Sequence, residues 1–446
     1  MYKAEQLSLL PELHSNIEDW TFNGASTREL THCYHDYPAR MIPQIASKLL
    51  DMFTPVDGTL LFDPYCGTGT SLVEGFIRGL NVIGTDLNPL ARLIAQTKVF
   101  PFDLSKLDKE LSKFNRFLLR PFTLKQNEWP EIPGISRIDF WFKPTVIQKL
   151  SYLKSYLDRI DDNNSRLFFQ VAFSETVRDS SNTRNEEFKL YRYDEQRLKR
   201  FNPDVLGIMA SKLKRNRIGL LQFLERIKSF KSVPKANVCQ FNTVNDIPHD
   251  KIRSNTVDIV VTSPPYGDSH TTVAYGQYSR LSAAWLGLEE SNKIDSKLMG
   301  SKIYKKIPNF PCEALNESLK GINKVDERRA TEVSSFYSDL LDSISNVAEV
   351  IKYGGYACYV VGNRKVKGIV LPTDTTIRDF FEQFGFNYID TFHRSIPNKR
   401  MPLRVSPTNA SGLVDTTMIQ EYIVVMRKKI PKVLMEKRIK YTAKRK

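Results

Sequence analysis

One short stretch combines a hydroxyl group, two prolines and an aromatic ring in a pattern that could serve chemistry on a flat polar substrate. It is Thr262-Ser-Pro-Pro-Tyr266, which directly follows the apolar, β-branched run from Ile259 to Val261. Consecutive prolines have a fixed φ and cannot donate to a sheet, so a strand here must end in a stiff turn. Such a turn fixes Ser263, the backbone carbonyls and the Tyr266 ring, and could hold an amino group and one face of a substrate ring. A Pro-Pro turn without a chemical role is the alternative.

A second stretch, Asp63-Pro-Tyr-Cys-Gly-Thr-Gly-Thr70, has the residues of a nucleoside-binding turn. It lies between a predicted strand ending at Asp63 and a predicted helix beginning at Ser71. Gly67 and Gly69 allow backbone conformations and a close ligand approach that a Cβ would prevent. The next predicted strand ends in Asp86, about 20 residues past the turn, where a carboxylate can accept hydrogen bonds from ribose hydroxyls. This register favours a nucleoside site over a purely structural turn.

The nucleoside could belong to a dinucleotide or to S-adenosylmethionine. The turn lacks the GxGxxG pattern of dinucleotide sites, and Asp63 stands directly ahead of it. A carboxylate at that position would repel a pyrophosphate but suits a sulfonium or an amino group. The residues therefore favour S-adenosylmethionine.

These stretches must be positioned by strands. Apolar runs predict seven strands, near residues 60, 83, 239, 260, 358, 390 and 423. The early alternation of strands and helices predicts a mostly parallel sheet with helices on both faces. Ligands of such sheets bind at the carboxyl ends of the strands, which is where both stretches and Asp86 are expected to meet.

Helical periodicity predicts several helices. We expect them from about Pro43 to 50, and at 71–78, 146–160, 165–177, 204–230, 334–351 and 373–384. Residues 269–326 show few regular elements and predict a long functional loop. The expected organisation is a core segment with the cofactor stretches at 1–100, a helical insertion at 101–235, the rest of the core at 236–430 and a basic tail at 431–446.

Charge predicts a polyanionic partner. The chain of 446 residues has a formal charge of +15, a pI of about 9.4 and 41% hydrophobic residues, as in a packed globular protein. Basic and aromatic residues alternate between Arg178 and Tyr193, and Lys212 to Arg217 forms a second basic cluster. Such segments suit phosphate contact and base stacking, although solvated helix faces look the same.

Other classes of protein are disfavoured. No run of about 18 apolar residues predicts a membrane span, and the first 19 residues lack the apolar core of a signal peptide. Five scattered cysteines without CxxC spacing favour a reducing cytoplasm over disulfides or structural zinc. His32 and His35 lack a nearby third ligand, so no metal site is expected.

Both chemical stretches resemble motifs of the amino-methyltransferases that act on DNA. Thr262-Ser-Pro-Pro-Tyr266 is similar to the Ser-Pro-Pro-Tyr form of the N4-cytosine enzymes of restriction–modification systems, whereas the N6-adenine form usually begins with Asp. His35-Asp-Tyr-Pro-Ala-Arg-Met41 resembles the motif that flanks the cofactor pocket in this family. The resemblance implies a Rossmann-like class I S-adenosylmethionine-dependent methyltransferase, with a seven-stranded, mostly parallel sheet and a helical insertion.

The resemblance also implies roles for individual residues. Ser263 and the Pro264 carbonyl would accept hydrogen bonds from the exocyclic amine of a base flipped out of duplex DNA, and Tyr266 would stack on that base. Pro265 completes the catalytic motif. The residues implied in cofactor binding are Tyr37, Arg40, Asp63, Tyr65, Gly67, Gly69, Thr70, Asp86, Asn88 and Thr262.

Several alternatives stay open. The implied enzyme is a prokaryotic, cytoplasmic cytosine-N4 methyltransferase acting on double-stranded DNA, paired with a restriction endonuclease. An N6-adenine DNA methyltransferase, an RNA amino-methyltransferase and a non-catalytic nucleic-acid-binding module are the competing interpretations. Pro311-Cys312 resembles the nucleophile of C5-cytosine enzymes, but it is not expected at a strand end. Target recognition could belong to residues 101–235 or to 269–326.

Overall fold

The computed structural model describes residues 19–120, 132, 134–184, 189–267, 275–288, 294–396, 404–405, 415–416 and 420–431. Its centre is a seven-stranded sheet in the order β3-β2-β1-β4-β5-β11-β8. All seven predicted strands are confirmed in this sheet. They are β1 (Leu60–Asp63), β2 (Asn81–Thr85), β3 (Ala236–Cys239), β4 (Val257–Thr262), β5 (Ile351–Val361), β8 (Phe386–Ser395) and β11 (Gln420–Lys428).

The sheet is parallel except for one strand. β1 pairs in parallel with β2 and β4, while β2 pairs with β3 and β4 with β5 in the same direction. β11 runs antiparallel to both of its neighbours, β5 and β8. The carboxyl ends of β1, β2 and β4 therefore lie at one edge, which brings Asp63, Asp86 and Thr262 together as predicted. The mixed α/β architecture confirms the predicted fold class.

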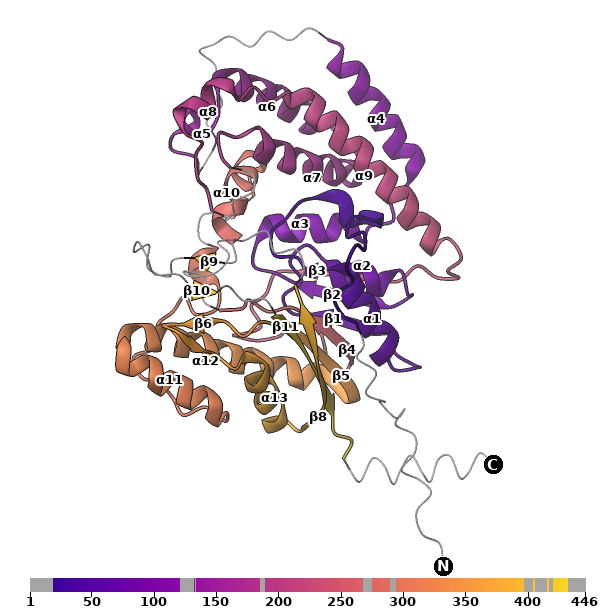
Figure 1. Ribbon diagram of the computed structural model, residues 1–446. Coiled ribbons are helices and arrows are strands. Elements are labelled where there is room, and N and C mark those ends of the chain that lie inside the picture. Colours follow the sequence, from indigo (N-terminus) through magenta and orange to yellow (C-terminus); the bar gives the residue numbers. More distant parts are fainter. Residues whose placement is uncertain are drawn as a thin grey trace, which may run out of the picture.

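Both faces of the sheet are buried. Successive strand residues enter opposite cores, as the two-residue period of a strand requires: Leu61 belongs to one cluster and Phe62 to the other. One face is covered by α1 (Pro43–Phe53), α2 (Thr70–Phe76) and α3 (Pro89–Lys98). The other face is covered by α11 (Glu313–Val325), α12 (Glu327–Val350) and α13 (Thr373–Gln383). Figure 1 shows the strands between these two groups.

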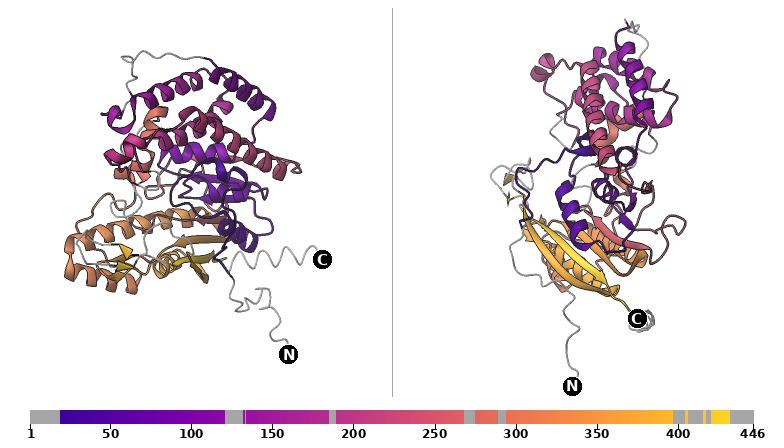
Figure 2. Two further views of the ribbon diagram at one scale, coloured as in Figure 1. Left: turned by 45° about the horizontal axis from the view of Figure 1, so that its top comes forward. Right: turned by 90° about the vertical axis from the view of Figure 1, so that its right-hand side faces the viewer.

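A helical region lies beyond α3, between β2 and β3 in the sequence. Figures 1 and 2 show it gathered at one end of the molecule. Its helices are α4 (Leu104–Leu118), α5 (Ile138–Trp141), α6 (Pro144–Leu157), α7 (Asn163–Ser180), α8 (Glu195–Arg200) and α9 (Val205–Ile227). They share the core of the α1–α3 face through residues such as Phe168, Phe173 and Phe223.

Two expectations were wrong. Residues 269–326 do not form a long loop, because their described part contains α10 (Tyr275–Leu286) and α11. α10 packs against α7 and bonds to it, with the Ser282 hydroxyl donating to the Ser174 carbonyl at 2.6 Å. Its buried side includes Gly276, Ser279 and Ser282, which obscure an apolar period. The Gly354-Gly355 pair predicts a turn ahead of a strand that begins at Tyr356. In the structure this pair lies inside β5, where the pairing with β4 is irregular and Gly354 has φ +84°.

Two expectations concern residues that the structure does not describe. Residues 432–446 of the basic tail, and Phe188 of the basic and aromatic segment, lie outside the described residues. Within the residues that are described, no helix is long and apolar enough to cross a membrane.

Candidate active site

A cleft opens at the carboxyl ends of the parallel strands. It contains about 990 Å³ of empty space, which includes open solvent at its mouth. Most of the residues singled out in the sequence line this cleft. They are Tyr37, Arg40, Asp63, Tyr65, Gly67, Thr70, Asp86, Asn88, Ser263 and Pro265.

The floor of the cleft is a buried carboxylate at the end of β1. Asp63 is 3% exposed and accepts hydrogen bonds from the Thr262 hydroxyl at 2.6 Å, the Tyr65 amide at 3.1 Å and the Ser71 hydroxyl. Burial raises the pKa of Asp63 to about 6, and the hydrogen bonds from Ser71 and Thr262 oppose that shift. Thr262 does not line the cleft, because its hydroxyl is used to hold Asp63.

The glycine turn and the second acid form one unit. The Asp86 carboxylate accepts from the Gly67 amide at 3.0 Å and from the Asn88 amide at 2.7 Å. Burial raises the pKa of Asp86. Gly67 has φ +49°, and a Cβ there would have no heavy atom within 4 Å, so the space beside it is open to a ligand. Gly69 serves packing instead, because a Cβ would lie 3.0 Å from the Ala95 Cβ.

One wall of the cleft is held by Asn88 and Arg40. The Asn88 side-chain amide donates to the Tyr37 hydroxyl at 2.7 Å and to the Ser279 hydroxyl at 2.6 Å, and its oxygen caps α3. Arg40 donates to the backbone carbonyls of His32 at 3.0 Å and His35 at 2.9 Å. These contacts shape the segment around Tyr37 and present it to the cleft.

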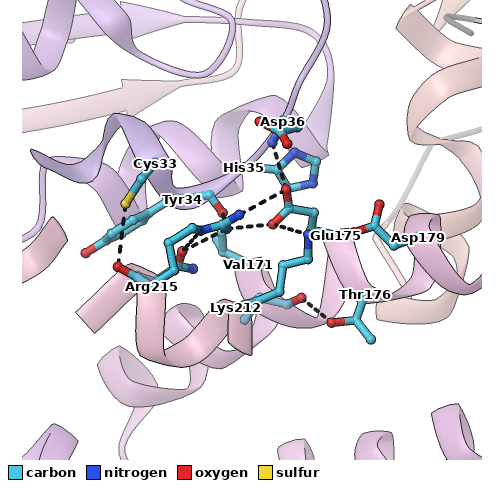
Figure 3. A network of polar contacts seen from close by, with 12 residues as sticks. Cys33, Tyr34, His35, Asp36, Val171, Glu175, Thr176, Asp179, Lys212 and Arg215 are labelled. Atoms are coloured by element: carbon cyan, nitrogen blue, oxygen red, sulfur yellow. Dashed lines mark hydrogen bonds and ion pairs between the residues drawn. The ribbon is translucent and has the colours of Figure 1, made fainter. Parts of the chain in front are cut away.

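Behind this wall, the helical region supplies a buried ionic network (Figure 3). Glu175 of α7 is 1% exposed and accepts from the Asp36 amide at 3.0 Å, next to His35. Lys212 and Arg215 of α9 pair with the same carboxylate at 3.2 and 2.6 Å. Burial raises the pKa of Glu175, but His35, Arg215 and Lys212 outweigh burial and lower this pKa to about 2. The helical region therefore anchors the wall of the cleft.

The predicted catalytic stretch lies at the rim. The Ser263 hydroxyl is 3.1 Å from the Val360 carbonyl oxygen and 3.3 Å from the Tyr266 hydroxyl. Tyr266 donates to the Glu421 carboxylate at 3.0 Å. Pro264 is buried beside them, while Pro265 lines the cleft.

Some residues of the site were missed in the sequence. Phe241, Asn242 and Thr243 line the cleft just after β3, at the same edge of the sheet as Asp63. The expectation that ligands bind at the carboxyl ends of the strands, which located Asp86, could also have found these residues. Leu298 and Met299 come from the segment predicted as a loop, and Tyr275 is the first residue of α10.

The basic segments differ from expectation. Arg178 is 2% exposed, Lys212 and Arg215 belong to the Glu175 network, and Arg217 pairs with Asp108 at 2.6 Å. Lys214 is the exposed cation of the second cluster. Most of that cluster therefore stabilises the helical region and is not a surface for phosphates.

Cys312 and His32, two further residues considered in the sequence, have surroundings that indicate a structural role. Cys312 is 1% exposed in the core beneath α11, outside the cleft. The His32 ring nitrogen bonds Glu74 at 2.9 Å. Within the described ranges, no group of three or more His, Cys, Asp or Glu side chains could hold a metal ion.

The fold and the cleft define a Rossmann-like methyltransferase. A family model described as "RMKL-like, methyltransferase domain" matches residues 29–100. The chain is 40% identical over 441 residues to the type II methyltransferase M.MvaI of Kocuria varians, covering 95% of this chain and 97% of that protein. It is 21% identical to the type II methyltransferase M.BsoBI of Geobacillus stearothermophilus, covering 85% and 84%. The chain belongs to the type II methyltransferases, the DNA-modifying enzymes of restriction–modification systems.

Among solved structures, the rRNA methyltransferase AviRa from Streptomyces viridochromogenes aligns with a TM-score of 0.31 and 11% identity, covering 88% of this chain and 86% of that one. The methyl donor is S-adenosylmethionine, as membership of the family requires. The cleft fits this cofactor, because the open space beside Gly67 can receive a nucleoside and Asp86 keeps free lone pairs on both oxygens.

We predict that Glu175→Gln lowers the free energy of unfolding by about 3–5 kcal/mol, because Lys212 and Arg215 would lose a buried counter-charge. Urea unfolding measures this change. The control is Glu225→Gln on α9, which breaks an exposed pair with Lys228 and should cost under about 1 kcal/mol.

The same network makes the free energy of unfolding depend on pH. Because the pKa of Glu175 is lowered in the folded protein, its carboxylate contributes its full stabilisation of the fold above about pH 4.5. This contribution is lost as the pH falls towards 2. The glutamine variant should lack this part of the acid sensitivity. Equal losses for the two variants at neutral pH would contradict the structural role of the network.

Proposed function

We propose that this protein transfers a methyl group from S-adenosylmethionine to the exocyclic N4 amine of a cytosine flipped out of duplex DNA. The methylated site would be protected from a cognate restriction endonuclease. The observation that carries the choice of base is Ser263 at the head of the catalytic stretch, where N6-adenine enzymes usually have Asp. Ser263 lines the cleft and its hydroxyl has an acceptor in the Val360 carbonyl.

The proposed chemistry follows from the amine. The lone pair of an exocyclic amine is delocalised into the ring, so the amine is a poor nucleophile. Ser263 and the Pro264 carbonyl would accept its two hydrogens and localise the lone pair towards the methyl donor. S-adenosylmethionine supplies an activated methyl group on a sulfonium, so positioning and electrostatics provide most of the rate. Tyr266 would pack against the flipped base.

We assign the cofactor to the cleft around Asp63 and Asp86. Asp86 would accept from the ribose hydroxyls, and the turn at Gly67 would lie against the nucleoside. Asp63, ionised above its pKa of about 6, would favour the cationic end of the cofactor. Tyr65, Thr70 and Tyr37 would complete the surface, while Arg40, Asn88, Gly69 and Thr262 would hold that surface in shape.

The helical region is proposed as a DNA-contacting part. α10 begins at the cleft with Tyr275 and ends near Trp285, whose ring lies 5.9 Å from that of Phe142 at the end of α5. Arg192, just before α8, donates to the Phe140 carbonyl at 3.1 Å. α8 carries exposed cations, and Tyr191 nearby is 48% exposed. Cations beside an exposed aromatic ring suit phosphate and base contacts.

The test of the reaction is base analysis of duplex DNA incubated with the protein. We expect N4-methylcytosine at one sequence, found by modification-sensitive sequencing. N6-methyladenine without N4-methylcytosine would refute the proposed base, and methylated tRNA with unmodified DNA would refute the proposed substrate. Ser263→Ala and Tyr266→Ala should each lower kcat at least about tenfold while leaving cofactor affinity within about twofold, since neither side chain holds the cofactor.

Cofactor affinity should depend on pH through Asp63. The raised pKa of about 6 predicts about tenfold weaker S-adenosylmethionine binding at pH 5 than at pH 7.5, because protonation removes the negative charge. Calorimetry on wild type and on Asp63→Asn measures this, and the variant should bind weakly at both pH values. Asp86→Ala should weaken binding and keep the pH dependence. A wild-type affinity independent of pH would overturn the role of Asp63.

DNA affinity tests the surface of α8. Lys199→Ala combined with Arg200→Ala should weaken DNA binding and lower the slope of log K against log salt concentration by about 2, as expected for two lost phosphate contacts. The matched control removes two exposed lysines of α11, Lys320 and Lys324. If the control lowers the slope as much as the α8 variant, this assignment fails.

A further inference from the structure

A second carboxylate lies behind the catalytic stretch. Glu421 is near the start of β11, and its carboxylate accepts from the Tyr266 hydroxyl at 3.0 Å. Its other oxygen pairs with Arg394, which lies directly opposite on β8 in the antiparallel register. The two side chains are 15% and 9% exposed. Sheet pairing therefore fixes this ion pair against the active-site rim.

The pair determines where the hydroxyl hydrogens point. A carboxylate held by a guanidinium accepts at both oxygens, so the Tyr266 hydrogen must point towards Glu421. The Tyr266 oxygen is then free to accept from Ser263, 3.3 Å away, and the Val360 carbonyl is a second acceptor at 3.1 Å. Both acceptors of the Ser263 hydrogen belong to the protein. The lone pairs of Ser263 are left for donors that enter the cleft.

The direction of these hydrogen bonds matters because a serine hydroxyl can donate as well as accept. An aspartate presents only lone pairs to an amine, whereas a serine hydroxyl presents them only if its hydrogen is directed elsewhere. A donor facing the amine would compete for the same lone pair that must attack the methyl group. A hydrogen-bond chain that ends in a carboxylate removes this possibility.

We propose that Glu421, held by Arg394, is a positioning residue that acts through Tyr266 and makes Ser263 an acceptor towards the substrate amine. Glu421 thus supplies, one tyrosine away, the carboxylate that position 263 lacks. The inference rests on the proposed function in one respect, namely that Ser263 meets the exocyclic amine.

The test is Glu421→Gln, analysed as a double-mutant cycle with Tyr266→Phe. In this variant Arg394 will bind the oxygen of the introduced side-chain amide, so the amide nitrogen will face Tyr266 and donate to it. The Tyr266 hydrogen can then turn towards Ser263 and occupy its lone pair. We expect kcat to fall roughly 10- to 100-fold, with KM for DNA and cofactor affinity within about twofold. In the Tyr266→Phe background, the same substitution should change kcat by less than about twofold.

Controls separate this role from folding and from the identity of the base. Asp390→Asn alters a partly buried carboxylate of β8 that does not contact the catalytic stretch, and it should leave kcat unchanged. Thermal unfolding and cofactor binding show whether each variant is folded. Should Glu421→Gln fail to fold, the cycle is made with Glu421→Asp, whose shorter side chain should also lower kcat only when Tyr266 is present.

The outcomes are distinct. Independent, multiplicative effects of Glu421→Gln and Tyr266→Phe on kcat would overturn the proposal, as would an unchanged kcat in folded Glu421→Gln. The cycle is measured as methyl transfer to DNA, whatever the base. A product of N6-methyladenine would refute the proposed base without deciding the coupling, which the cycle decides by itself.

Discussion

The organisation of this protein depends on one buried carboxylate. Asp63 ends β1 and accepts hydrogen bonds from the glycine turn through the Tyr65 amide, from α2 through Ser71 and from the end of β4 through Thr262. Its burial disfavours the charged form, and these donors compensate in part, which leaves the pKa at about 6. The same atoms join the cofactor turn to the strand that carries Ser263. A change at Asp63 therefore affects both the glycine turn and the end of β4.

The second constraint comes from outside the sheet. The segment around Tyr37 has no strand or α-helix of its own and depends on contacts from two directions. Asn88 and Arg40 hold it on the side of the cleft, and Glu175 holds it from the helical region. A helical insertion that contacts DNA would thus be packed directly against a wall of the cofactor cleft.

Much of this arrangement can be predicted from the sequence, because it is encoded locally. Seven apolar runs mark the seven strands, and the glycine turn and the Ser-Pro-Pro-Tyr stretch carry their chemistry within a few residues. Contacts across the sheet cannot be found in this way. Glu421 reaches Tyr266 only because β11 inserts antiparallel between β5 and β8, and Glu421 then faces Arg394. The helix α10 was missed because the small residues Gly276, Ser279 and Ser282 on its buried side obscure the apolar period of Tyr278, Leu281 and Trp285.

Net charge was the least reliable guide to the position of the DNA. A formal charge of +15 favours a polyanionic partner, but it does not locate the surface. Lys98 is fully buried, with its pKa lowered well below normal by burial, and Lys212 and Arg215 neutralise Glu175 inside the helical region. Cations of this kind shape the scaffold and are not available to phosphates. The exposed cations of α8, namely Arg197, Lys199 and Arg200, are few, but they follow the exposed Tyr191 closely in the chain. Their position, more than their number, is the reason to propose this surface as the path of DNA to the active site.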